Sequence, residues 1–142
     1  MPGSTKLSFM KRTEIKQTLD GPLQEEGYKF MAAVFAVHNE LGGGLEEEVY
    51  QECLELELFD QCIPFVAKQE LTIQYKGQEL KKRYTPDLCV YGGIVVELKA
   101  VYQLLPEHEA QLFNYMRLSQ KRVGYLVNLA ALKKAEWRRY VL

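Results

Sequence analysis

The chain has 142 residues, enough for one domain with a hydrophobic core and too few for two domains of ordinary size. Hydrophobic residues make up 47% and charged residues 26%, a composition that excludes wholesale disorder, collagen and a coiled coil as the whole structure. The 18 basic and 19 acidic residues leave a formal net charge of -1, which argues against a strongly basic, non-specific nucleic-acid binder but allows a local basic groove.

The cysteines and the hydropathy pattern indicate the cellular setting. Cys53, Cys62 and Cys89 are an odd number of cysteines without a CxxC pair, so we expect free thiols in a reducing compartment. No segment is long and apolar enough to cross a bilayer, and residues 1–16 lack the apolar stretch of a secretory signal. The sequence therefore predicts a cytoplasmic protein without a membrane span.

The chain begins with a polar stretch. Residues 1–24 are expected to form a loose N-terminal arm, within which residues 13–19 could form a short helix. The remaining residues, 25–142, are expected to form a single domain. Helical spacing of apolar residues predicts its first helix over residues 25–41, and the glycines at 42–44 end that helix.

The middle of the chain changes from helical to extended patterning. A second helix is predicted over residues 45–60, where glutamates surround an apolar stripe and the early ones suit the positive end of the helix dipole. Pro64 then opens an extended region. Alternating apolar and polar residues predict a strand over residues 71–75, and residues 78–82 are expected to pair with it as a hairpin.

The last third of the chain alternates between strands and helices. Extended runs are predicted over residues 84–90 and 94–100, and the β-branched start of the second run indicates a central strand buried on both faces. A helix over residues 106–119, a strand over residues 123–128 and a basic helix over residues 130–142 follow. This order predicts an α/β fold with a mixed central sheet flanked by helices.

Residues 85–99 hold two acids and a lysine around a glycine turn. Strand alternation places Glu97 and Lys99 on the same face. If residues 91–93 form a three-residue connection, with a glycine at positive φ, Asp87 faces Glu97 across the hairpin, whereas a two-residue turn would separate the acids. We predict the three-residue form.

Such a group of side chains favours one kind of chemistry. Two adjacent carboxylates repel each other, and a divalent cation with a preference for oxygen ligands, magnesium or manganese, relieves that repulsion. A metal ion there can polarise a phosphoryl oxygen, and Lys99 can orient water or stabilise the negative charge of the transition state. The residue types and their spacing therefore predict a metal-dependent phosphodiester hydrolase.

A longer pattern surrounds these residues. Pro86-Asp87, followed after nine residues by Glu97-Leu98-Lys99, resembles the PD-(D/E)XK nuclease superfamily. The sequence is similar in particular to the subgroup called GxxExxY proteins, whose motif is read in residues 44–50 as Gly-Leu-Glu-Glu-Glu-Val-Tyr. Residues 37–42 and 108–115 also resemble that subgroup, and the similarity runs from about residue 28 to residue 128.

The resemblance implies a restriction-endonuclease-like core, and we expect a nuclease that hydrolyses nucleic-acid phosphodiester bonds, with DNA favoured over RNA as the substrate. It implies Mg²⁺ or Mn²⁺ as the cofactor, and a homodimer is expected because small nucleases of this type often pair to cut two strands. The residues that it implies are the metal ligands Asp87, Glu97 and Glu47 with the backbone carbonyl of Leu98, the catalytic Lys99, and Gln111 on the helix after the core strands.

Simpler interpretations stand beside these. The two acids and the lysine could form a salt bridge, although two acids for one lysine leave a charge unpaired. Glu47 could lie on a solvated helix face, Gln111 could bind nearby backbone, and residues 81–83 could contact phosphates or form a solvated charged run. Two other functions stay open: a catalytically inactive nuclease-fold module that binds nucleic acid or a protein partner, and a structural or regulatory homo-oligomer.

Overall fold

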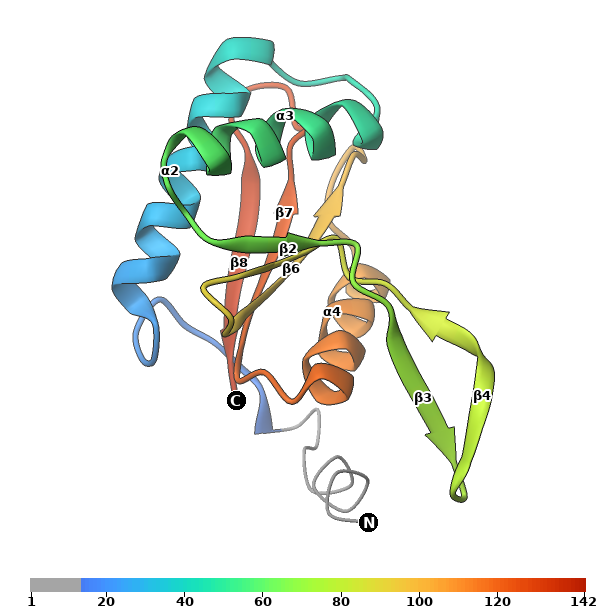
Figure 1. The fold of residues 1–142 in the computed structure, drawn as a ribbon. Helices are drawn as coiled ribbons and strands as arrows, with labels where there is room; N and C mark the ends of the chain where they lie inside the picture. Colours follow the sequence, from blue (N-terminus) through green and yellow to red (C-terminus); the bar gives the residue numbers. More distant parts are fainter. Residues whose placement is uncertain (1–13) are drawn as a thin grey trace.

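A mixed β-sheet organises the chain (Figure 1). The computed structural model describes residues 14–142, and within them six strands form one sheet in the order β1-β8-β7-β6-β5-β2. Strands β6 and β7 run parallel, and every other neighbouring pair is antiparallel. The strands are β1 (Lys16–Gln17), β2 (Phe65–Ala67), β5 (Leu88–Val90), β6 (Ile94–Lys99), β7 (Val123–Asn128) and β8 (Glu136–Val141).

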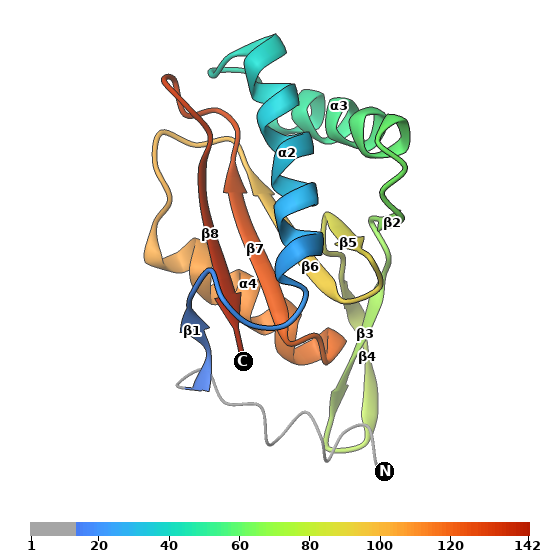
Figure 2. The same ribbon diagram turned by 90° about the vertical axis from the view of Figure 1, so that its left-hand side faces the viewer.

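Helices cover both faces of this sheet (Figure 2). Helices α2 (Gln24–Leu41) and α3 (Glu47–Asp60) lie on one face, and α4 (Pro106–Ser119) lies on the other. Each face has its own buried apolar cluster, with Val96 and Leu98 of β6 in the first and Val95 in the second. The alternation of side chains along β6 therefore binds both helical layers to one strand, as the predicted α/β fold requires.

The central strands agree closely with the sequence pattern. Strand β6 is buried along almost its whole length, and α4 connects it to its parallel neighbour β7. Parallel strands need such a crossover because a tight turn cannot join them. Over residues 14–142, no helix combines the length and the apolar character needed to cross a bilayer.

A two-stranded hairpin projects from the body of the molecule (Figure 1). It consists of β3 (Leu71–Tyr75) and β4 (Gln78–Tyr84). Its turn residues Lys76 and Gly77 both have positive φ, 48° and 79°, as the tightest hairpin turns require. At the base of the hairpin, Tyr84 packs edge to face on Tyr115 of α4, with ring centroids 5.2 Å apart.

The predicted C-terminal helix over residues 130–142 is wrong, because the chain forms strand β8 there. Lys133 and Lys134 lie in the loop before it, and Arg139 is buried with 2% of its surface exposed. The guanidinium of Arg139 donates hydrogen bonds to the Pro22 carbonyl (2.5 Å) and the Tyr125 hydroxyl (3.3 Å). The basic residues therefore do not line one helix face.

Two further expectations change near β1 and β5. The short helix expected over residues 13–19 is replaced, in its described part, by strand β1, which pairs with Tyr140 and Val141 of β8. Residues 1–13 of the expected arm lie outside the described residues. The extended run predicted over residues 84–90 is divided, since β4 ends at Tyr84 and β5 begins at Leu88.

Candidate active site

The β5–β6 hairpin has the predicted three-residue connection. Leu88 pairs with Val96, Cys89 with Val95 and Val90 with Ile94, so residues 91–93 form the turn. Within the turn Gly92 has a φ of 67° and Tyr91 a φ of 54°. The same register, extended by one pair, places Asp87 opposite Glu97, and the two carboxyl groups interact directly.

Asp87 is held by three different parts of the chain. Its Oδ2 accepts a hydrogen bond from the Leu98 N–H (2.7 Å), and its Oδ1 accepts one from Lys68 Nζ. Its main-chain carbonyl accepts hydrogen bonds from Gln51 Nε2 (3.1 Å) and from the Lys68 N–H (3.2 Å). Only 3% of Asp87 is exposed, so these contacts fix the carboxylate within the fold.

Glu97 is equally buried but is not satisfied. It is 3% exposed, and its Oε2 has no hydrogen-bond partner among the described residues. Burial, and after it the hydrogen bond and negative charge of Asp87, raise the pKa of Glu97 to about 10, although the Lys99 ammonium acts in the opposite direction. Two buried acids therefore share one small space, with a carboxyl oxygen available to a ligand.

Lys99 is oriented by α4. Its Nζ donates a hydrogen bond of 2.5 Å to Gln111 Oε1, and Gln111 Nε2 donates one of 3.3 Å to the Tyr115 hydroxyl. Burial and then the negative charge of Glu97 raise the pKa of Tyr115 to about 12. Gln111 is neutral, so it positions the ammonium of Lys99 without cancelling its charge.

Lys68 is a second cation in the site. Burial alone would lower the pKa of Lys68, but the hydrogen bond and charge of Asp87 outweigh it, so the net shift is upward. The side chain is 49% exposed, which leaves its ammonium partly in contact with water. Lys68 therefore neutralises Asp87 from the solvent side.

Glu47 lies at the edge of the site on α3. Burial and the negative charge of Asp87 raise its pKa, while Lys99 and Lys68 act in the opposite direction. Glu47 and Lys68 line a pocket of about 270 Å³ on the acidic face of α3. Within residues 14–142 no three Asp, Glu, His or Cys side chains gather into a ready metal cage, so the role of Glu47 as a ligand stays a prediction.

The donors present fit a hard divalent cation. Asp87 and Glu97 offer carboxylate oxygens, and Glu97 Oε2, which has no hydrogen-bond partner among the described residues, is an acceptor that a cation could engage. The N–H and C=O of one strand residue point to the same strand edge. Because the Leu98 N–H reaches Asp87, we expect the Leu98 carbonyl on the same edge as that carboxylate.

Comparison with known proteins agrees with this geometry. A model of the PD-(D/E)XK nuclease superfamily matches residues 24–140. The chain belongs to the PD-(D/E)XK nuclease superfamily. PD-(D/E)XK proteins generally hydrolyse phosphodiester bonds and typically depend on a divalent metal. The mixed sheet between helical layers fits the restriction-endonuclease-like core expected for them.

The fold is also similar to that of a solved structure. The chain is similar to a protein described as "Crystal structure of SSO0001", with 21% sequence identity and a TM-score of 0.53. The match covers 82% of this chain and 57% of that protein, so the chain spans little more than half of its relative's length. No curated protein matches the chain.

Sequence reasoning did not find three residues of this candidate site. Gln51 and Tyr115 each follow a predicted site residue by four positions on a helix, so helical spacing could have located both. Lys68 has no such signal, because it lies in a linker far along the chain from Asp87.

Tyr50 of the GxxExxY motif packs in the core with 1% exposure, and its hydroxyl donates a hydrogen bond of 2.7 Å to the Gly42 carbonyl.

Proposed function

We propose that the protein is a metal-dependent nuclease that hydrolyses phosphodiester bonds of nucleic acid, with DNA as the preferred substrate. The observation that carries the proposal is the β5–β6 hairpin, which brings Asp87 and Glu97 together with Lys99 on the face of Glu97. Membership of the PD-(D/E)XK superfamily supports it. We also assign the chain to the GxxExxY subgroup, on the motif in residues 44–50.

Mg²⁺ or Mn²⁺ is the proposed cofactor. Asp87, Glu97 and the Leu98 carbonyl would hold it, with Glu47 as a further acid at the edge, and water and substrate oxygens would complete the shell. When bound, the cation would polarise the phosphoryl group and lower the pKa of a water molecule. Lys68 would then leave the Oδ1 atom of Asp87, and its partial exposure gives the ammonium room to turn toward a phosphate.

Lys99 has the catalytic role in this proposal. Its ammonium would donate hydrogen bonds to the attacking water and to the phosphoryl oxygens, where negative charge develops in the transition state. Gln111 keeps the ammonium in place through its 2.5 Å hydrogen bond. Gln111 is therefore a positioning residue, and Tyr115 supports it from one helical turn away.

The test is a nuclease assay with magnesium on labelled DNA and on RNA of the same sequence. Asp87→Ala and Lys99→Ala are expected to lose roughly a hundredfold or more of the cleavage rate. Matched controls are Asp60→Ala and Lys29→Ala, which change exposed residues on the outer surface of α3 and α2. Activity that is unchanged in both site variants would defeat the proposal.

The second candidate is a catalytically inactive module that binds nucleic acid or a protein partner. The contacts of Asp87 favour it, because Lys68 and the Leu98 N–H already engage both carboxylate oxygens. Salt-dependent binding of nucleic acid without metal-dependent cleavage would favour this function. A third candidate, a purely structural or regulatory homo-oligomer, would bind no metal, and calorimetric titration with manganese would test it.

Two properties of the setting are proposed with the function. Cys53, Cys62 and Cys89 are free thiols, which supports a reducing compartment such as the cytoplasm. A homodimer would place two such sites on opposite strands of a duplex. Sedimentation of the protein alone and with DNA would test that assembly.

A further inference from the structure

We propose that the β3–β4 hairpin is an arm that holds the sugar–phosphate backbone of nucleic acid next to the catalytic site. Its contacts would be Lys81 and Lys82 on β4, together with Arg117 on α4. The inference rests on the proposed nuclease function for the choice of partner. The residues that would make these contacts have no role in the catalytic proposal.

The hairpin begins and ends at the site. Lys68 lies in the short segment that joins β2 to the hairpin, and it contacts Asp87 through both its side chain and its N–H. Asp87 itself lies just beyond the other end of the hairpin, three residues after Tyr84. Figure 1 shows the hairpin extending from this point away from the sheet. A strand of nucleic acid at Asp87 and Glu97 would therefore leave the site along the hairpin.

Positive charge is concentrated on this arm. Residues 71–84 carry four basic side chains and one acidic side chain, a net charge of +3. Because the whole chain has a net charge of -1, all its other residues together carry -4. The local charge has the sign that a phosphate backbone requires, in a molecule whose overall charge disfavours non-specific binding.

Two of the four cations are engaged within the hairpin. Arg83 contacts Glu79 at 3.3 Å and the Leu80 carbonyl at 2.5 Å, and Lys76 lies over the Tyr75 ring at 5.4 Å.

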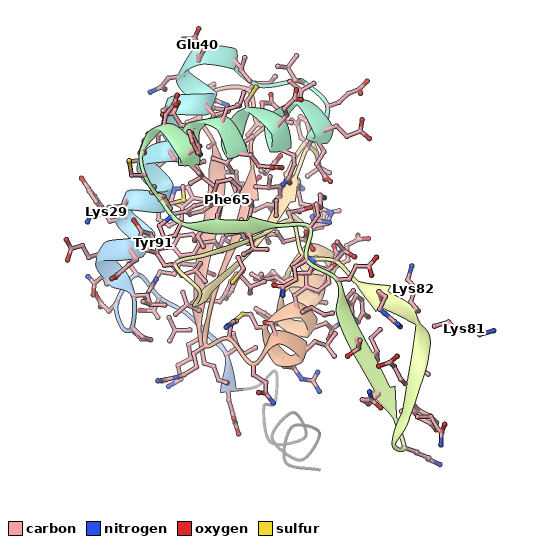
Figure 3. The ribbon with its side chains drawn as sticks, viewed as in Figure 1. Lys29, Glu40, Phe65, Lys81, Lys82 and Tyr91 are labelled. Carbon is pink, nitrogen blue, oxygen red and sulfur yellow. The ribbon has the colours of Figure 1, made fainter. Side chains whose placement is uncertain are left out.

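Lys81 and Lys82 are the other two cations. Both are exposed, and no ion pair within residues 14–142 involves either of them. Figure 3 shows them on β4, with the Lys81 side chain extending outward into solvent. These two ammonium groups are therefore available to an anionic partner.

A groove lies at the base of the arm, against α4. Tyr84, two residues after Lys82, packs on Tyr115 of α4. Tyr84 and Arg117 line a groove of about 210 Å³ between the hairpin and α4. Arg117 takes part in no ion pair within residues 14–142, so its guanidinium is a cation that a phosphate could pair with.

Fluorescence anisotropy with a short labelled DNA duplex, its single strands and the matching RNA tests the proposal. Calcium replaces magnesium, so that the probes are not cut. The variant Lys81→Gln/Lys82→Gln should bind several-fold more weakly at low salt. Each lost duplex phosphate contact lowers the slope of log affinity against log salt by about 0.9, so the slope should fall by about 2. Arg117→Gln should lower it by about 1.

The matched control is Lys16→Gln/Lys29→Gln, which removes the same charge from β1 and α2. Figure 3 shows Lys29 on the opposite side of the molecule from Lys81. The control should keep the wild-type salt slope, and thermal unfolding should confirm that all variants are folded. Equal losses in both double variants, or binding of an acidic polypeptide but of no nucleic acid, would overturn the proposal.

The outcomes separate the arm from the catalytic site. If cleavage by the wild type depends on Asp87 while Lys81→Gln/Lys82→Gln binds nucleic acid as tightly as the wild type does, the proposed role of the hairpin is wrong and the nuclease proposal is supported. If the wild type cuts no substrate, and salt-dependent binding of nucleic acid is lost in the hairpin variant but not in the control variant, the proposed role of the hairpin is supported and the nuclease proposal is wrong.

Discussion

Glu97 links stability to proton binding in the metal-free protein. Its pKa is about 10 in the folded chain, because of burial and of Asp87, and its ordinary value is 4.5. Between these two values the folded state keeps a proton that the unfolded chain has lost. The free energy of unfolding contributed by this group is therefore greatest below the lower value and falls as pH rises toward the upper one.

We predict that Glu97→Gln removes this pH dependence, because the amide is neutral at every pH. Denaturant unfolding in EDTA across this range should show a flatter profile than the wild type, with higher stability at the alkaline end. The exposed Glu40→Gln variant should keep the wild-type profile. Identical profiles for wild type and Glu97→Gln would mean that Glu97 is ionised in the folded state.

Lys68 and a metal ion would compete for the same oxygen of Asp87. Lys68→Met should therefore lower the stability of the metal-free protein, because it leaves a buried carboxylate without its cation. The same variant should bind manganese more tightly in calorimetric titration, and Lys68→Arg should resemble the wild type. A weaker affinity for manganese in Lys68→Met would show that the ammonium assists the metal instead.

At the residue scale, the sequence was informative where contacts are local. Asp87 and Glu97 could be paired because strand alternation and the length of one connection determine the register. Lys68 and Gln51 could not be found in this way. They reach Asp87 through packing between segments that are distant in sequence, 19 and 36 residues away.

In the proposed mechanism, helix α4 contributes to catalysis through the amide of Gln111. Gln111→Ala is predicted to lower kcat roughly 10- to 100-fold, as loss of an outer hydrogen-bond partner commonly does, while KM changes little. The reason is that Lys99 loses its acceptor and no longer holds one position. Steady-state kinetics should show the split, and the exposed Gln103→Ala should match the wild type. A rise in KM alone would assign Gln111 to substrate binding.

At the scale of elements, the C-terminal segment forms strand β8 where the sequence pattern predicts a helix. Lys133, Lys134, Arg138 and Arg139 suggested a basic helix, but Trp137, Tyr140 and Val141 favour extended structure. The decisive force is pairing with β7, whose free edge takes β8 along its whole length. Such pairing is a tertiary contact, so periodicity within the segment could not reveal it.

The whole molecule has a core that does not depend on a metal. Apolar clusters lie on both faces of the sheet, and the site adds only a small polar group between them. We predict that the protein stays folded in EDTA and unfolds cooperatively. Saturating manganese should raise the melting temperature, since ligand at a hundred times its Kd adds about 2.7 kcal/mol. Asp87→Ala should abolish that rise, and unfolding in EDTA would instead identify a structural metal.

The contact between Lys68 and Asp87 closes the chain on itself at the two ends of the β3–β4 hairpin. The segment between these two residues leaves the central sheet and returns to it at the same place. Its length and charge can therefore vary while the sheet beneath stays the same. Proteins that share the proposed site could therefore differ in the nucleic acid that they bind. Replacing the hairpin between Lys68 and Asp87 would be a direct way to change that choice of substrate.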